Sequence, residues 1–159
     1  MALWTLAEQQ LYKPIDQNNL TKFNQLQNEV EINDIVKYLG YEFYQELKRN
    51  PSNYATLLNG GTYTYSGYTY TFEGFKKVCC YLLYARYVRQ SYIQDTFSGF
   101  MVHTADNMQK ISAGELANQE ARYKEIAGTL WDECYRYLTT LNLLNWFPIK
   151  SKSKRIDSL

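Results

Sequence analysis

The segment Phe72–Ile93 constrains the fold more than any other part of this chain. Its sequence is FEGFKKVCCYLLYARYVRQSYI, and at about 100° per residue its apolar side chains point to three sides of a helix instead of forming one stripe. A helix in water that is apolar all round must be covered on most sides. The segment is interrupted by Lys76, Lys77, Arg86 and Arg89, which excludes a membrane span. We therefore expect a central helix with the rest of the chain wrapped around it.

Helical patterns on the N-terminal side predict elements that could cover this central helix. Residues 16–39 carry apolar side chains at helical spacing, with a possible break near Asn33, and Gly40 stands where many helices end. Tyr41–Arg49 predicts a second short helix, and one further helical turn is expected over 53–58. The inward face of the first helix is expected to include Leu20, Phe23, Gln27, Val30, Ile32, Ile35, Val36 and Leu39.

A long last helix is predicted from Ser112 onward. Ser112 and Glu115 have the spacing of a capping box, in which two side chains satisfy backbone N–H groups at a helix start. Beyond them, apolar residues recur at alternating spacings of four and three, which is typical of a seam that packs on another helix. The seam consists of Tyr123, Ala127, Leu130, Cys134, Tyr137, Leu141 and Leu144.

Between these helical parts, residues 61–72 predict a β-hairpin. Their sequence, GTYTYSGYTYTF, alternates strictly around Ser66-Gly67, which favours a two-residue turn. In that register the aromatic side chains all share one face of the hairpin. An isolated hairpin is marginally stable in water, so this face must lie on a helix, on a neighbouring subunit, or on both. We expect the partner contacts to include Tyr63, Tyr65, Tyr68 and Tyr70.

The two ends of the chain lack the helical pattern. Residues 1–15 predict an extended or loosely helical arm, in which Trp4 could dock on the domain's own surface or on a neighbouring subunit. Trp146 and Phe147 could anchor the chain at the domain edge, since Pro148 bars further helix. Residues 149–159 predict a tail that is disordered when alone and that contacts a partner protein through its basic side chains. These are Lys150, Lys152, Lys154 and Arg155.

These segments together predict a mainly α protein. The expected architecture is a compact helical bundle around a central helix over residues 16–148, with one inserted β-hairpin and extended N- and C-terminal arms. Between the central and last helices we expect a loop with a short strand at Phe100–His103, and Phe100 and Met101 are further candidate partner contacts.

Composition excludes several kinds of function. The chain has 17 basic and 16 acidic residues, so its net charge gives no general attraction to nucleic acid or to acidic membranes. Three cysteines and a single histidine, His103, form no zinc-ligand motif, and the odd cysteine count favours a reducing compartment. Residues 1–11 lack the pattern of a signal peptide. We expect no metal, no cofactor and no catalytic site.

The order of motifs around the hairpin resembles the head–tail connector, or adaptor, proteins of tailed bacteriophages, especially those of crAss-like and other Bacteroidetes phages. The sequence GGTYTYSGYTYTFEGFKKVCCYLLYARYV follows YLGYEFYQEL and precedes DTFSGFMVHT. The resemblance covers roughly residues 16 to 148, and Phe75 stands where leucine is commoner in the family. The matching positions are Leu39-Gly40, then Phe43, Tyr44 and Leu47, then Gly74-Phe75-Lys76, Tyr84 to Tyr87, and Thr96 to Gly99.

This resemblance implies a structural virion protein without enzymatic activity. The family's subunits form a homo-oligomeric ring, commonly of twelve copies, below the portal. The ring extends the DNA channel and joins the head to further ring, stopper or tail proteins, and DNA passes through it without sequence-specific binding. Such a protein would be made in the host bacterial cytoplasm, would contact no membrane, and would reside at the head–tail junction of the virion. The alternative is a small helical module that binds protein or nucleic acid outside any virion.

Overall fold

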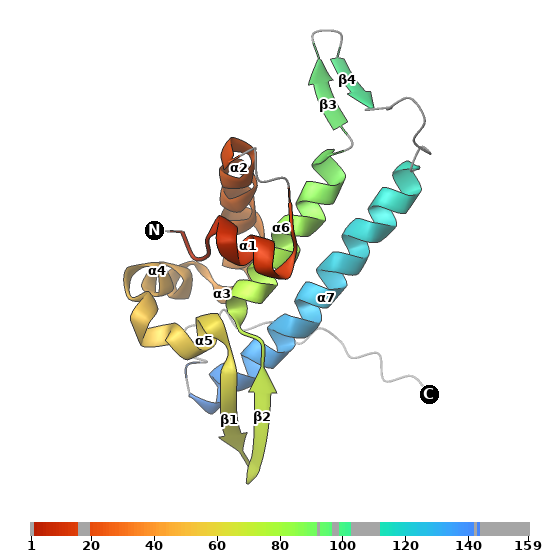
Figure 1. The fold of residues 1–159 in the computed structure, drawn as a ribbon. Coiled ribbons are helices and arrows are strands. Elements are labelled where there is room, and N and C mark those ends of the chain that lie inside the picture. The colour runs from red at the N-terminus through yellow and green to blue at the C-terminus, as the bar shows by residue number, and fades with distance from the viewer. Residues whose placement is uncertain are drawn as a thin grey trace, which may run out of the picture.

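Two long helices, α6 (Phe75–Ser91) and α7 (Ala113–Thr140), lie side by side and form the centre of the fold. The computed structural model describes residues 2–15, 20–91, 93–96, 99–102, 112–141 and 143. Figure 1 shows the shorter N-terminal helices grouped beside α6, with one two-stranded sheet at each end of the α6–α7 pair. The prediction of a mainly α bundle around a central helix is confirmed.

The shorter elements follow the order that the sequence predicts. Gly40 ends the first helical region with a positive φ of 74°, a conformation that favours glycine, and a new helix begins at the next residue. Residues 16–19 of the predicted first helix lie outside the described residues. The elements are α1 (Leu6–Tyr12), α2 (Leu20–Val30), a π-helical turn η1 (Glu31–Ile35), α3 (Val36–Leu39), α4 (Tyr41–Arg49), a 3-10 turn η2 (Pro51–Tyr54) and α5 (Ala55–Asn59).

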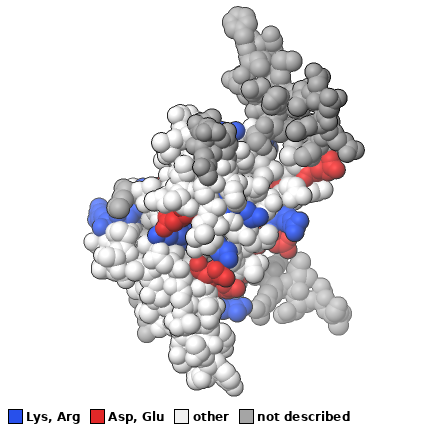
Figure 2. Space-filling model, in the orientation of Figure 1, with Lys and Arg blue, Asp and Glu red and all other residues white. Residues whose placement is uncertain are grey.

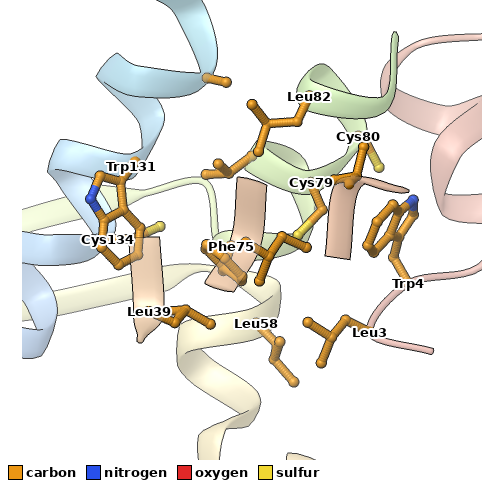
Figure 3. Close-up of a cluster of buried hydrophobic side chains, with 14 of the residues drawn as sticks. Leu3, Trp4, Leu39, Leu58, Phe75, Cys79, Cys80, Leu82, Trp131 and Cys134 are labelled. Atoms are coloured by element: carbon orange, nitrogen blue, oxygen red, sulfur yellow. The ribbon is translucent and has the colours of Figure 1, made fainter. Parts of the chain in front are cut away.

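The core is built on both sides of α6, as its all-round apolar pattern requires. Figure 3 shows Phe75 and Cys79 of α6 between Trp131 of α7 on one side and Trp4 on the other. The Phe75 and Trp131 rings meet edge to face, with centroids 5.5 Å apart, and Leu83 is fully buried further along α6. The Trp131 ring is thus one of the large side chains through which the last helix packs on α6.

The stripe of α7 that is buried differs from the predicted seam by one residue at two places. Ala127 and Cys134 are buried as predicted, but Leu130 and Tyr137 are only partly buried. The next residues along the chain, Trp131 and Leu138, are buried in their place, and Leu141 is 45% exposed. Both stripes have helical spacing, and the observed one places the larger Trp131 ring against the core. Leu144 lies outside the described residues.

The N-terminal segment packs on the core, and of the two alternatives expected for residues 1–15 the structure shows the helical one over Leu6–Tyr12 and not an extended arm. A capping box of Thr5 and Glu8 begins α1. The Trp4 side chain is 1% exposed, and its indole N–H donates to the Gln9 side-chain oxygen at 3.3 Å. Gln9 Nε2 in turn donates to the backbone carbonyl of Cys80 in α6 at 3.1 Å. Of the two alternatives for Trp4, docking on the domain's own surface is the one observed, so this side chain is not available to a partner.

Charged groups fix α1 to the two long helices. Lys76 of α6 makes an ion pair with Glu8 at 2.6 Å. Burial alone would raise the pKa of the Glu8 carboxyl. The lysine and the hydrogen bonds from Thr5 lower that pKa by a larger amount, so it lies below the ordinary value. The Lys13 ammonium, at the end of α1, lies 4.9 to 5.4 Å from the centroids of three tyrosine rings, a cation–π arrangement. The rings are those of Tyr81, Tyr84 and Tyr123.

The predicted break near Asn33 is the π-helical turn η1, and it rotates the helix face. Glu31 is 4% exposed, whereas Ile32, predicted to face inward, is 69% exposed. A π-turn adds a residue to one helical turn, so the residue before Ile32 points to the core instead. The Glu31 carboxylate accepts from the Tyr44 hydroxyl at 2.5 Å and from the Lys48 ammonium at 2.8 Å. Burial of this carboxylate is thereby offset by a charged partner.

A second strand pair stands at the far end of α6. The strands β3 (Ile93–Thr96) and β4 (Gly99–Val102) are antiparallel, with Ile93 opposite Val102. The sequence predicts one strand at Phe100–His103 but not its partner, because the helical pattern of the central segment runs to Ile93 and the polar residues 94–96 indicate a loop. His103 lies outside the described residues.

Candidate interaction surface

The hairpin formed by β1 (Gly61–Tyr65) and β2 (Tyr68–Phe72) has the register that the sequence predicts. Tyr65 is opposite Tyr68, and Gly61 is opposite Phe72. Ser66 and Gly67 form the two-residue turn with φ angles of 50° and 82°, the signs that a type I′ turn requires. This turn fixes which residues face each other, so the aromatic side chains of both strands share one face.

The inner half of this aromatic face rests on the last turns of α7. The Phe72 ring stacks on Tyr137 with centroids 4.7 Å apart, and the Tyr63 ring lies 5.6 Å from Tyr137. Tyr63 also stacks on Tyr70 across the hairpin, at 5.4 Å. Burial raises the pKa of the Tyr63 hydroxyl above its ordinary value. The helix thus supplies the support that an isolated hairpin lacks.

The outer half of the face is uncovered. Tyr65 is 55% exposed, Tyr68 is 70% exposed and Tyr70 is 39% exposed. The hairpin sequence contains no charged residue, and Figure 2 shows the region of the hairpin as a white area without acidic or basic side chains. An uncharged face rich in tyrosine has the composition of the central part of a protein interface.

A hollow of about 260 Å³ lies where the hairpin meets α7. Its lining combines three tyrosine rings with two side chains from the last turns of α7, namely Tyr63, Tyr65, Tyr70, Arg136 and Thr139. The Thr139 hydroxyl donates to the Tyr135 carbonyl at 2.9 Å. Within the described part of the chain, the Arg136 guanidinium makes no ion pair or hydrogen bond. The hollow therefore offers aromatic surface together with a cation that no described residue pairs.

The base of the hairpin is held by close contact between two backbone segments. Gly60 ends α5 with a φ of 85°, and Gly74 precedes α6 with a φ of 86°. A Cβ placed on Gly74 would lie 2.5 Å from the Asn59 carbonyl carbon and 2.7 Å from the Leu58 carbonyl oxygen. Only glycine allows this approach, and the crossing fixes the direction in which the hairpin projects from the helices.

The structure places the predicted contact residues in three groups. Four of them, Tyr63, Tyr65, Tyr68 and Tyr70, come together on the hairpin face. Phe100 and Met101 lie in β4, at the opposite end of the α6–α7 pair, and their side chains are not described. The residues Trp146, Phe147, Lys150, Lys152, Lys154 and Arg155 lie outside the described residues.

Sequence reasoning missed the contribution of α7 to this surface. The sequence predicts Tyr137 only as part of a seam that packs on another helix, and it gives no contact role to Arg136. The alternation of the hairpin demanded a covering element but gave no indication of which one. A signal was present in Tyr137 itself, since an aromatic side chain near the end of a packed helix can extend the core onto a neighbouring sheet.

Among the described residues, three or more side chains that could hold a metal ion do not gather anywhere. All three cysteines are buried, and burial raises the pKa of the Cys80 and Cys134 thiols to about 12 and that of Cys79 well above its ordinary value. Such thiols are poor nucleophiles. None of the described helices has the length and apolar character needed to cross a membrane.

Comparisons with known proteins give one match. Residues 35–155 match a family described as a family of unknown function, DUF6712. The matched region includes the hairpin, both long helices and the residues that line the hollow. Neither the curated proteins nor the solved structures give a significant match.

Proposed function

We propose that this chain, which belongs to the family of unknown function DUF6712, is a structural virion protein, the head–tail connector of a tailed bacteriophage. In this proposal, copies of the chain form a closed ring, of about twelve subunits by the resemblance described above, below the portal. The ring extends the DNA channel and joins the head to further ring, stopper or tail proteins. The observation that carries the proposal is the uncovered tyrosine face of a hairpin whose projection is fixed at its base.

A ring requires that each subunit offer two different complementary surfaces, because neighbouring copies contact each other in a head-to-tail manner. The β1–β2 face is suited to be one of them. Tyrosine provides a large contact area with few rotatable bonds, and the residues exposed here are held by strand pairing before any partner arrives. The entropy cost of ordering the surface is thus already met by folding.

The charge of the chain is consistent with a ring that surrounds DNA without binding the DNA tightly. The formal net charge is +1, and the basic residues described on α6 largely face acidic partners, as Lys76 does with Glu8 and Arg86 with Asp34. Phosphate contacts strong enough to retain DNA need several unpaired basic side chains. A channel through which DNA must pass favours the absence of such a cluster.

The proposal is tested by assembly of a hairpin variant. Tyr65→Ala with Tyr68→Ala removes two exposed rings and keeps Tyr63 and Phe72, whose rings contact Tyr137 of α7, so circular dichroism should be unchanged while ring formation falls at least tenfold. The matched control is Thr64→Ala with Thr69→Ala, which changes the directly paired residues on the opposite face and should assemble normally. Mass photometry, with the protein alone and with its cognate portal, gives the mass of the assembly.

Two outcomes would contradict the proposal, the first its ring and the second its contact surface. A wild-type chain that stays monomeric at all concentrations, both alone and with the portal, would rule out a ring. Normal assembly by the folded tyrosine variant would show that the ring, if present, uses another surface.

A further inference from the structure

The hollow between the β1–β2 hairpin and α7 is not filled by any described residue, and a basic side chain lies at its edge. Its wall is made of tyrosine rings, and the exposed Arg136 stands at its α7 side. Arg136 makes no ion pair or hydrogen bond with another described residue. A guanidinium that is free beside aromatic rings can stack on a further aromatic side chain, and the indole ring of tryptophan gives the strongest interaction of this kind.

The chain itself leaves α7 next to this hollow. Thr139 lines the hollow and α7 ends at Thr140, so the exit from the helix adjoins the site. Leu143 packs against the core cluster, which keeps the chain at this edge of the domain. Trp146 follows three residues later, and three residues of extended chain span about 10 Å. An aromatic pair, Trp146-Phe147, therefore lies within reach of an aromatic hollow that has an unpaired cation.

We propose that Trp146 and Phe147 of the same chain fill this hollow, with the Trp146 indole stacked on Arg136. The same chain is favoured over a second copy because a short tether gives a local concentration in the millimolar range, which a free partner does not reach. The inference goes beyond ring formation and does not depend on it. Tyr68, the most exposed ring of the hairpin, is not part of the lining and remains available to a neighbouring copy.

This anchor would fix the place on the domain from which the basic tail extends. With Trp146 and Phe147 in the hollow, residues 149–159 would leave the domain at the β1–β2 end and not at the β3–β4 end. Their four basic side chains would then extend along the same side of the molecule as the exposed tyrosine face. A partner protein that contacts Tyr68 would meet the tail as well.

The environment of Trp146 tests the proposal in the full-length protein. The chain has three tryptophans, and Trp4 and Trp131 are both buried. Labelling with 5-fluorotryptophan gives one ¹⁹F resonance for each, and Trp146→Phe identifies the third. We expect the Trp146 resonance to be shifted from that of free indole and to be independent of protein concentration, while the resonances of Trp4 and Trp131 report an intact fold.

Variants of the hollow supply the control. Arg136→Ala should move the Trp146 resonance most of the way to the position of free indole, and Tyr70→Ala should do the same. The matched variant Arg122→Ala removes another exposed arginine of α7, one outside the lining of the hollow, and should leave the resonance in place. If Tyr70→Ala alters the two buried tryptophans, the exposed-site variant Arg136→Ala alone decides the result.

Three results would overturn the proposal. A Trp146 resonance at the free-indole position in the wild type would show that the hollow is empty of the tail. A shifted resonance that Arg136→Ala leaves unchanged would place the anchor elsewhere. A shift that appears only as the protein concentration rises would assign the hollow to a second copy. Because ring formation is measured separately by mass, each of these results leaves the proposed connector function to its own test.

Discussion

Gly74→Ala should be among the most destabilising single substitutions in this chain, although it adds only one methyl group. The added Cβ would lie 2.5 Å from the Asn59 carbonyl carbon and 2.7 Å from the Leu58 carbonyl oxygen, and closer still to the Gly60 nitrogen. All three are backbone atoms at the end of α5, so no side-chain rotation can make room. The φ of 86° at Gly74 adds a second cost, since it favours glycine whatever the space.

The magnitude follows from these two costs. A non-glycine residue at positive φ loses roughly 1–2 kcal/mol, and overpacking a site that cannot relax costs about 1–3 kcal/mol. We therefore expect Gly74→Ala to lower the free energy of unfolding by about 2–5 kcal/mol, a large part of the 5–15 kcal/mol typical of a domain. The midpoint of urea denaturation should fall while its slope stays constant.

Gly128→Ala is the matched control, and it should have the opposite sign. Gly128 lies inside α7, and a Cβ there meets no atom within 4 Å. Replacing an interior helical glycine by alanine stabilises by about 0.5–1 kcal/mol. A loss below about 1 kcal/mol for Gly74→Ala would refute the reasoning, because it would mean that the α5 end moves freely and that the hairpin base is not fixed.

Three further predictions concern the core and its charges. Trp131→Ala should lower the free energy of unfolding by about 3–5 kcal/mol, and Leu130→Ala by clearly less, which denaturation of the two variants will check. Lys48→Met should cost about 1–3 kcal/mol because the buried Glu31 carboxylate loses its cation, and replacing Glu31 by leucine in the same chain should recover most of that loss. The pKa of Glu8 is lower in the folded chain than its ordinary value of 4.5, so its stabilisation is complete above that value and is lost as the pH falls through the folded pKa. Between pH 6 and pH 3 the wild type should therefore lose more stability than Glu8→Gln, as thermal unfolding at each pH will show.

The hairpin register could be predicted from the sequence because local rules determine it. Alternation with a period of two and the turn pair Ser66-Gly67 leave one register in which all the rings share a face, and the structure has that register. The central helix could be predicted for a similar reason, since a helix that is apolar on all sides must be buried in a core. In both cases the information lies within a few residues along the chain.

Other features depend on contacts between distant segments and could not be predicted in this way. Burial of Trp4 depends on Gln9 reaching the Cys80 carbonyl, a contact between residues 71 positions apart. The inward turn of Glu31 depends on Tyr44 and Lys48, which belong to a later helix. In α7, two overlapping stripes had equally good helical spacing, and only the shape of the facing core favours Trp131 over Leu130. The surface on α7 that receives the hairpin was missed for the same reason.

The three buried cysteine thiols can serve as built-in probes of local opening of the core. Cys79 and Cys80 lie on α6 and Cys134 lies on α7, all buried in the core around α6. A thiol reagent can reach them only during excursions in which that region opens, so the labelling rate reports the free energy of local opening. If the proposed ring forms, comparing the labelling rate in free and in assembled subunits would show whether assembly holds the two helices together or separates them.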